Sequence, residues 1–288
     1  MLALPLTAQE GNGAKPAAPT TAKPAAGAGD LLVAPTRVIF EGNTRTTTVS
    51  LTNIGSAKAT YRIAIVHQRM TETGAVQLLK DGEQVAGELF ADSLVRFTPR
   101  QVTLEPRQGQ TIRMQLRKPA DLADGEYRSH LYIHALPPDR PAATNPDDAP
   151  PDGLAVRLTP VFGITIPVIV RQGQLTAQTT ITEIVLLPPA PPKAPPQLSF
   201  RLNRSGARST YGDLTVTLLP AGGKKETVVG RMNGIAVYTP NLSRAMLLPL
   251  NVPKGMALQN GRLKITYRAK REEGNAVLAE AVFELPAK

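Results

Sequence analysis

An apolar residue at every second position is the feature that most constrains how this chain can fold. The alternation begins at Leu31 and recurs in short segments separated by glycine, proline, asparagine or aspartate. A period of two turns one face of each segment towards a core and the other towards solvent, which is typical of β-strands. No segment carries the period of a helix longer than a turn or two. The sequence therefore predicts an all-β protein.

Length and composition extend this prediction to two β-sandwich domains with aliphatic cores. The 288 residues exceed the roughly 100–200 that one domain usually holds. The chain has 27 prolines and 23 glycines, which supply many turns, and no tryptophan, so neither core is built around one as in antibody domains. Positions expected to face the cores include Leu32, Val38, Phe40, Tyr61, Ile63, Leu131, Ile133, Leu198, Phe200, Leu247, Leu263, Ile265 and Val282.

The sequence divides into three parts. Residues 1–30 are expected to be flexible and to begin with the remainder of a secretory signal, because the apolar stub Met1 to Ala8 ends in small residues and an Ala/Pro/Gly-rich stretch follows. Residues 31–172 are expected to form the first sandwich. A polar, proline-rich loop precedes its last strand, in which one parity is apolar from residue 154 to residue 170. Residues 173–288 repeat the turn-rich pattern and are expected to form the second sandwich.

The residues that carry most enzyme chemistry are missing or dispersed. There is no cysteine, which excludes disulfides and thiolate sites. His130 and His134 share a strand parity, but four residues along a strand span ~13 Å, too far to bind one metal ion. We expect both imidazoles to lie on a solvated or loosely packed face. No nucleophile or paired-carboxylate motif is present, so the sequence predicts neither an enzyme, nor a cofactor, metal or small-molecule substrate.

The positive charge of the chain is spread along it. Lysine and arginine exceed aspartate and glutamate by 33 to 23, a formal net charge of +10. The basic residues are scattered among strand-like segments without interleaved aromatic residues, which a nucleic-acid surface would need. The best apolar run, residues 161–170, is about half the ~20 residues of a membrane-spanning helix. We therefore expect a soluble mature protein that does not bind nucleic acid.

Tyr127 fits a structural motif of β-sandwiches. It follows Asp124 and Gly125 at the spacing of a tyrosine corner, in which the phenol donates a hydrogen bond back to nearby backbone at the start of a strand. Ser129 lies where immunoglobulin domains carry a cysteine. Tyr127 is therefore expected to be architectural.

An ordered set of segments resembles the PapD-type periplasmic pilus chaperones. The set begins with Ala34 to Gly42 (APTRVIFEG) and continues with Phe97-Thr98-Pro99, Leu104-Glu105-Pro106, Gln110 to Arg113, and Asp124 to Leu131 (DGEYRSHL). It covers residues 31–172 well and the rest only in outline. The resemblance implies two immunoglobulin-like sandwiches, no enzymatic activity, and a periplasmic role in which pilus subunits are held and delivered to an outer-membrane usher.

The resemblance also implies two client-binding sites. Arg37 occupies the position of the cleft arginine that binds the client's carboxyl terminus. Composition alone favours the alternative that Arg37 is a solvated arginine on a strand. Its replacement by alanine is expected to cost little stability. The family's cleft lysine has no counterpart in Ile164 to Pro167 (ITIP). The first part of the strand after the loop is expected to donate apolar side chains to the client's sheet, whereas Ile164 to Val170 is expected to be an ordinary strand buried within the first sandwich. The donated side chains are expected to be Leu154, Val156, Leu158 and Phe162.

Two points stay open at this level. A structural or adhesive sandwich protein of the cell envelope would share the fold without handing on clients. Weak self-association through exposed strands is compatible with the same pattern.

Overall fold

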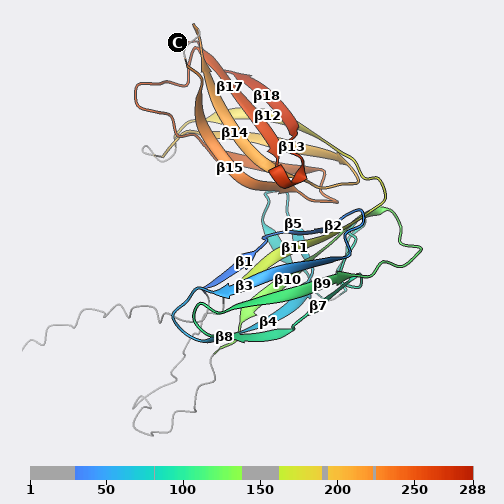
Figure 1. Ribbon diagram of the computed structural model, residues 1–288. Coiled ribbons are helices and arrows are strands. Elements are labelled where there is room, and N and C mark those ends of the chain that lie inside the picture. Colours follow the sequence, from blue (N-terminus) through green and yellow to red (C-terminus); the bar gives the residue numbers. More distant parts are fainter. Residues whose placement is uncertain (1–29, 81, 138–161, 190–193, 223–224, 288) are drawn as a thin grey trace, which may run out of the picture.

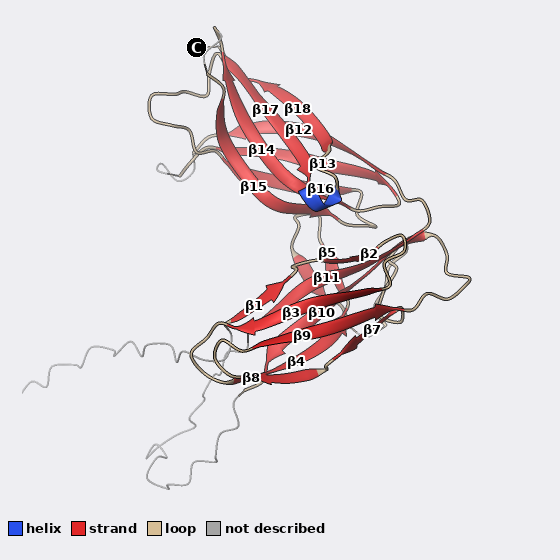
Figure 2. Cartoon of the chain, in the orientation of Figure 1, coloured by secondary structure: helices blue, strands red, loops and turns tan. Residues whose placement is uncertain are grey.

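The computed structural model describes residues 30–80, 82–137, 162–189, 194–222 and 225–287. In this part of the chain the regular elements are strands apart from one 3-10 helix, η2 (Arg271–Glu273) (Figure 2). No helix among these residues has the length and hydropathy needed to cross a membrane. The all-β prediction is therefore confirmed.

The first sandwich has the strand order of an immunoglobulin fold. One sheet has the order β1-β3-β9-β7, and the facing sheet has the order β2-β11-β10-β4-β8. The chain leaves the first sheet after β1 and enters the second at β2, so that β1 and β2 are edge strands of different sheets. The bounds are β1 (Leu31–Ala34), β2 (Val38–Phe40), β3 (Thr46–Asn53), β4 (Ala59–Val66), β7 (Val95–Thr98), β8 (Gln101–Leu104), β9 (Gly109–Leu116), β10 (Gly125–Ala135) and β11 (Gly163–Gln172).

The second sandwich is also immunoglobulin-like. A sheet of order β12-β13-β16 packs on a sheet of order β15-β14-β17-β18. A separate hairpin, β5 (Gln68–Met70) with β6 (Val76–Leu78), extends from the chain of the first sandwich. The bounds in the second sandwich are β12 (Ala177–Leu187), β13 (Gln197–Gly206), β14 (Thr210–Pro220), β15 (Thr227–Val237), β16 (Ser243–Pro249), β17 (Gly261–Ala269) and β18 (Val277–Glu284).

Each sandwich has its own aliphatic core, as the alternation predicted. Phe40 and Leu131 are buried in the first core, and Leu198 and Ile265 in the second. Three expected core positions are wrong: Leu32, Leu247 and Val282 are each at least half exposed, at 55%, 50% and 51%. Each has an apolar neighbour on the chain, so the pattern left open which of the two residues faces inward.

The tyrosine corner is present. The Tyr127 hydroxyl donates to the Ala123 carbonyl at 2.9 Å. Ser129 is fully buried, and its Oγ accepts from the backbone N–H of Ala91 at 2.9 Å. These bonds fix the entry into β10, the strand next to β11 in the sheet.

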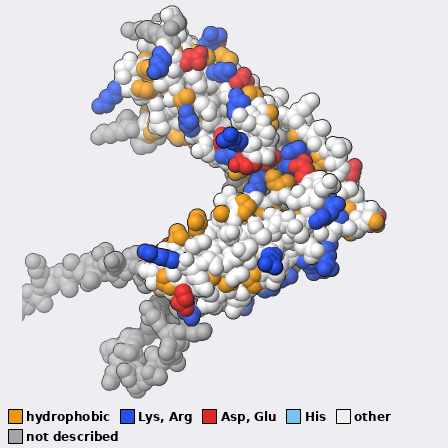
Figure 3. Space-filling model, viewed as in Figure 1, with side chains coloured by type: hydrophobic (Ala, Val, Ile, Leu, Met, Phe, Trp, Pro, Cys, Tyr) orange, Lys and Arg blue, Asp and Glu red, His pale blue; other side chains and the backbone are white. Residues whose placement is uncertain are grey.

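The two sandwiches are joined on one side by the short connection from β11 to β12 (Figure 1). Gly173 begins this connection with φ +80°, and a Cβ at this position would overlap the Asp124 carboxylate. Glycine is required there for both its backbone freedom and its lack of a side chain. The sandwiches meet at an angle, and the surface between them is hollowed (Figure 3).

Candidate binding cleft

Arg37 lies where the two sandwiches meet. It directly precedes β2, and its Nη1 donates to the Tyr238 hydroxyl of the second sandwich at 3.0 Å. Its Nε lies 3.6 Å from Glu273 Oε1, and the guanidinium stacks over the Tyr211 ring at 4.3 Å. The side chain is 9% exposed. The interpretation of Arg37 as a solvated strand arginine is therefore wrong, because the second sandwich covers it.

The Arg37 guanidinium retains hydrogen-bonding capacity. Its Nη2 is buried and has no hydrogen-bond partner among the described residues, and its Nε has only the ion pair with Glu273, at 3.6 Å and without a hydrogen bond. Buried donors of this kind are uncommon in folded proteins, because they lose water without replacing it. A carboxylate matches the planar fork of a guanidinium, so Arg37 is chemically suited to bind one.

A pocket of 530 Å³ opens beside Arg37, and both sandwiches line it. Tyr211 and Lys270 of the second sandwich form part of its wall. The Lys270 ammonium pairs with Asp213 at 2.7 Å, and this hydrogen bond raises the pKa of Lys270. Lys270 lies between β17 and η2 and thus brings a second positive charge to the pocket from a segment that no sequence pattern linked to Arg37.

An ionic cluster beside the pocket joins the sandwiches. Arg171, the last but one residue of β11, donates to Glu126 at 3.0 Å and to Glu41 at 2.9 Å within the first sandwich. It reaches Glu273 of η2 at 3.4 Å. Arg208 of the second sandwich also pairs with Glu273, at 3.3 Å. No sequence pattern indicates this cluster, because its members are far apart along the chain and each resembles an ordinary charged residue of a strand or loop.

The edge of β11 is partly unpaired. β11 pairs with β10 along its whole length, but β2 covers its other edge only at residues 168–170. The Phe162 carbonyl accepts from Ala135 N–H on the β10 side. Because backbone groups alternate between the two edges of a strand, Gly163, Thr165 and Pro167 direct theirs to the other edge. No described strand pairs with that edge at residues 163–167.

Pro167 suits an edge position. Proline has no N–H, and within sheets it is tolerated where its nitrogen faces away from a neighbouring strand. Its nitrogen points to the open edge, so the β10–β11 ladder keeps its hydrogen bonds. The segment Ile164 to Pro167 provides carbonyl acceptors along this edge but no lysine.

The expected donor residues are only partly described. Leu154, Val156 and Leu158 lie outside the described residues. Phe162 is described: it directly precedes β11, is 61% exposed, and shares its parity with Ile164 and Ile166. Phe162 therefore presents an apolar side chain to solvent next to the unpaired edge.

His130 contradicts the expectation of a solvated imidazole. It is buried in β10, and desolvation, with the positive charge of Arg128 as the next cause, lowers its pKa to about 3. His130 is consequently neutral at physiological pH. No cluster of histidine and acidic residues suited to a metal ion occurs in the described part of the chain.

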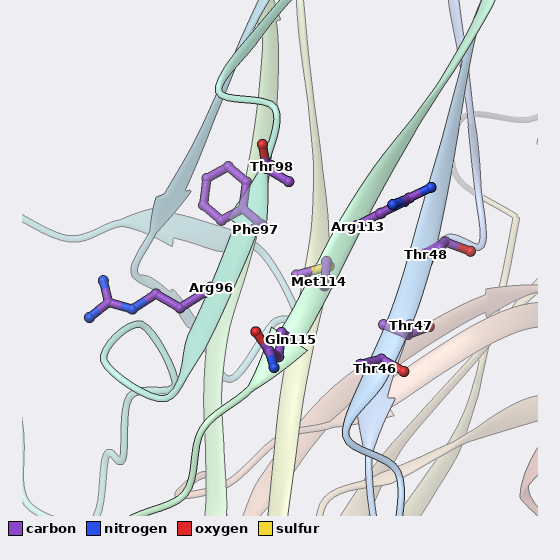
Figure 4. Close-up of a pocket in the computed structure, with 9 residues that line it drawn as sticks. All are labelled: Thr46, Thr47, Thr48, Arg96, Phe97, Thr98, Arg113, Met114 and Gln115. Atoms are coloured by element: carbon purple, nitrogen blue, oxygen red, sulfur yellow. The ribbon is translucent and has the colours of Figure 1, made fainter.

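A larger hollow of 660 Å³ lies over β3, β7 and β9. In Figure 4 the Arg96 and Arg113 side chains extend from their strands in opposite directions. A ligand site needs polar groups that converge, so this hollow is a weaker candidate than the cleft beside Arg37.

The fold and the cleft define a two-sandwich protein with an open strand edge, and the sequence assigns its family. The chain matches the family described as "Pili and flagellar-assembly chaperone, PapD N-terminal domain" over residues 30–175. It belongs to this family, which is one of chaperones and not of enzymes. The resemblance stated from the sequence is confirmed.

Distant likenesses to solved structures accompany the family match. The YadV chaperone is 15% identical, with 89% of this chain and 100% of that chain covered and a TM-score of 0.44. The CupB2 chaperone of Pseudomonas aeruginosa is 14% identical, with 89% and 100% covered and a TM-score of 0.43. The structure of the Salmonella enterica SafA pilin in complex with the SafB chaperone is 15% identical, with 90% of this chain and 100% of that chain covered and a TM-score of 0.40. A search of curated proteins finds no match.

Proposed function

We propose that this protein is a periplasmic chaperone that binds pilus subunits by β-strand addition and delivers them to an outer-membrane usher. The observation that carries the proposal is the open edge of β11 at residues 163–167, beside the exposed Phe162. An unpaired strand edge with an apolar neighbour favours aggregation unless a partner covers it. A subunit that lacks one strand would supply such a partner.

Main-chain pairing and apolar burial would supply most of the affinity. Each Leu, Val or Phe side chain that enters a client groove contributes ~1.5–3 kcal/mol. Leu154, Val156 and Leu158 continue the parity of Phe162 in the sequence, so the donated row would extend towards the N-terminus of β11. This row would determine how tightly the client is held.

Arg37 would set the register of the added strand. The terminal carboxylate of a client can accept from its Nη2, which has no hydrogen-bond partner among the described residues, and a hydrogen bond to a charged group contributes ~1.5–3 kcal/mol. Lys270, which also lines the pocket, would supply the second cation that β11 lacks. The client's terminus would thus contact both sandwiches.

The proposal is tested by co-expression with candidate pilus subunits from the same genome, followed by copurification and affinity measurement. Thr165→Pro removes a backbone donor from the open edge while leaving the β10 ladder intact. We expect it to weaken binding about tenfold, or ~1.4 kcal/mol. Thr165→Ala changes only the side chain and should bind like the parent.

Side-chain donation is tested by comparing substitutions at even-numbered and odd-numbered positions of the same segment, whose side chains face opposite sides of the strand. Phe162→Glu and Val156→Glu would each place an unpaired charge where an apolar side chain is expected, and binding should fall by several kcal/mol. Arg157→Glu, on the other parity, should have a much smaller effect. Equal losses from Val156→Glu and Arg157→Glu, or no copurifying subunit, would favour a structural or adhesive envelope protein instead.

A further inference from the structure

The β5–β6 hairpin belongs to the chain of the first sandwich but docks on the second. Its turn lies against β16: the Glu72 carbonyl accepts from the backbone N–H of Ala245 at 2.7 Å. The Met70 carbonyl accepts from Asn241 Nδ2 at 2.8 Å. Figure 1 shows β5 between the two sandwiches. The hairpin thus connects them at a place separate from the linker and the ionic cluster.

The hairpin covers part of an exposed strand edge. β16 is the edge strand of the sheet β12-β13-β16. Because the Ala245 N–H bonds to Glu72, it faces away from β13, and by alternation so does the Leu247 N–H. Pro249 has no N–H to expose. The hairpin therefore satisfies an edge donor that would otherwise need water or another chain.

Side-chain packing adds to these backbone bonds. Met70 is 3% exposed, and its Sδ lies 4.0 Å from Arg244 Nη1. Arg244 also donates to the Ala236 carbonyl at 2.8 Å, and desolvation lowers its pKa. Gly74, with φ +83°, lies against the Arg244 guanidinium, where a Cβ would overlap it. Met70 and Gly74 thus both contact the Arg244 side chain of the second sandwich.

The base of the hairpin pairs with the loop that follows it, and the Leu89 carbonyl of this loop accepts from the Arg128 N–H of β10 at 2.7 Å. Arg69 donates from Nε and Nη2 to the two carboxylate oxygens of Glu88, at 2.6 and 2.9 Å. Leu79 N–H donates to the His67 carbonyl at 3.0 Å. Two-point pairing of arginine with a carboxylate fixes geometry as well as charge. A displacement of the second sandwich would therefore distort the hairpin, because its base cannot rotate freely.

We propose that the β5–β6 hairpin is a strut that sets the angle between the two sandwiches, with Met70 as its anchor. The walls of the Arg37 pocket come from different sandwiches, so this angle sets the distance between Arg37 and Lys270. Met70 is in this sense a positioning residue for client capture. That last step rests on the proposed function, whereas the effect on the angle does not.

The angle is measured on the free protein by pulsed electron paramagnetic resonance between two spin labels. The chain has no cysteine, so Ser50→Cys and Arg231→Cys, both exposed and in different sandwiches, are labelled without background. In this labelled protein, Met70→Ala should replace a narrow distance distribution with a broad one. Met256→Ala, at an exposed methionine of the second sandwich, is the control and should leave the distribution narrow. Equal distributions in the two variants would overturn the proposal.

A second pair of variants tests the backbone contact. Ala245→Pro removes the donor to Glu72, and Leu247→Pro places the same ring on the same edge at a position the hairpin does not cover. Only Ala245→Pro should broaden the distribution. This pair decides the outcome if Met70→Ala does not fold. Broadening by both prolines alike would overturn the proposal.

Client capture is measured with the pilus subunit that copurifies with the parent protein. Met70→Ala should weaken its binding about fivefold, or ~1 kcal/mol, and Met256→Ala should not. A broadened distribution with unchanged affinity would overturn the positioning role. If no subunit binds the parent, the proposed function fails, while the distance measurement still decides whether the hairpin is a strut.

Discussion

The Arg171 guanidinium and the Glu126 carboxylate form an ion pair at 3.0 Å in which both side chains are almost completely buried, at 1% and 0% exposure. Glu126 also accepts from the backbone N–H and the hydroxyl of Ser209, in the second sandwich. A buried charge is tolerated only where partners replace its lost hydration. The pair therefore belongs to the contact between the sandwiches as much as to the first core.

Breaking this pair should destabilise the protein strongly. Arg171→Ala leaves the Glu126 charge buried beside Ser209, and removing one partner of a buried pair costs about 3–5 kcal/mol. Urea denaturation of the variant should show this loss in the free energy of unfolding. Lys264→Ala, which breaks an exposed pair with Glu280, is the control and should cost at most about 1 kcal/mol. Similar losses in both would contradict the assigned role of Arg171.

Arg37→Ala should reduce both client binding and stability. The variant loses the bond to Tyr238 and the contact with Glu273, so its free energy of unfolding should fall by about 1.5–3 kcal/mol. Arg37→Lys keeps the charge but not the two-point geometry, and should recover part of the stability with little of the binding. Urea denaturation and client affinity measure the two effects.

Arg45→Ala is the control for Arg37, because the Arg45 side chain is exposed and donates to the Gly42 carbonyl of its own turn at 3.2 Å. It should leave both quantities near those of the parent. Normal stability in Arg37→Ala would show that the guanidinium is not held between the sandwiches as described.

His130 should make the protein less stable in acid. Its pKa is about 3 when folded and about 6.5 when unfolded, so between these values the unfolded chain binds the extra proton. Stability is retained above pH ~6.5 and falls by about 1.4 kcal/mol per pH unit towards pH 3. His130→Gln should remove this part of the slope. Urea denaturation at several pH values measures the difference, and equal slopes in parent and variant would contradict the buried, neutral imidazole.

Tyr127→Phe should cost about 0.5–1.5 kcal/mol of stability, the usual net value of one hydrogen bond. The phenol donates to Ala123 and so holds the turn before β10. Thermal or urea unfolding measures the loss. Tyr132→Phe, in the same strand, is a matched control because no hydrogen bond of its hydroxyl is found among the described residues. The prediction fails if both changes cost the same.

Part of the candidate site can be predicted from the sequence. Arg37 and the strand after the loop were found through their place in a recognisable set of segments. Lys270, Glu273 and Met70 were not, because nothing in a linear pattern links them to Arg37. Their proximity depends on how one sandwich packs on another.

The sequence by itself determined the strands, the two aliphatic cores and the tyrosine corner, because alternation and turn residues act over a few neighbouring positions. Where two apolar residues adjoin, as at Leu247 and Leu248, local pattern could not choose which faces inward. The tertiary structure made that choice, and it also buried Arg37 and His130, left the edge of β11 open, and brought the hairpin to β16. These outcomes depend on long-range packing, in which the free energy of a side chain is set by partners far away in the chain.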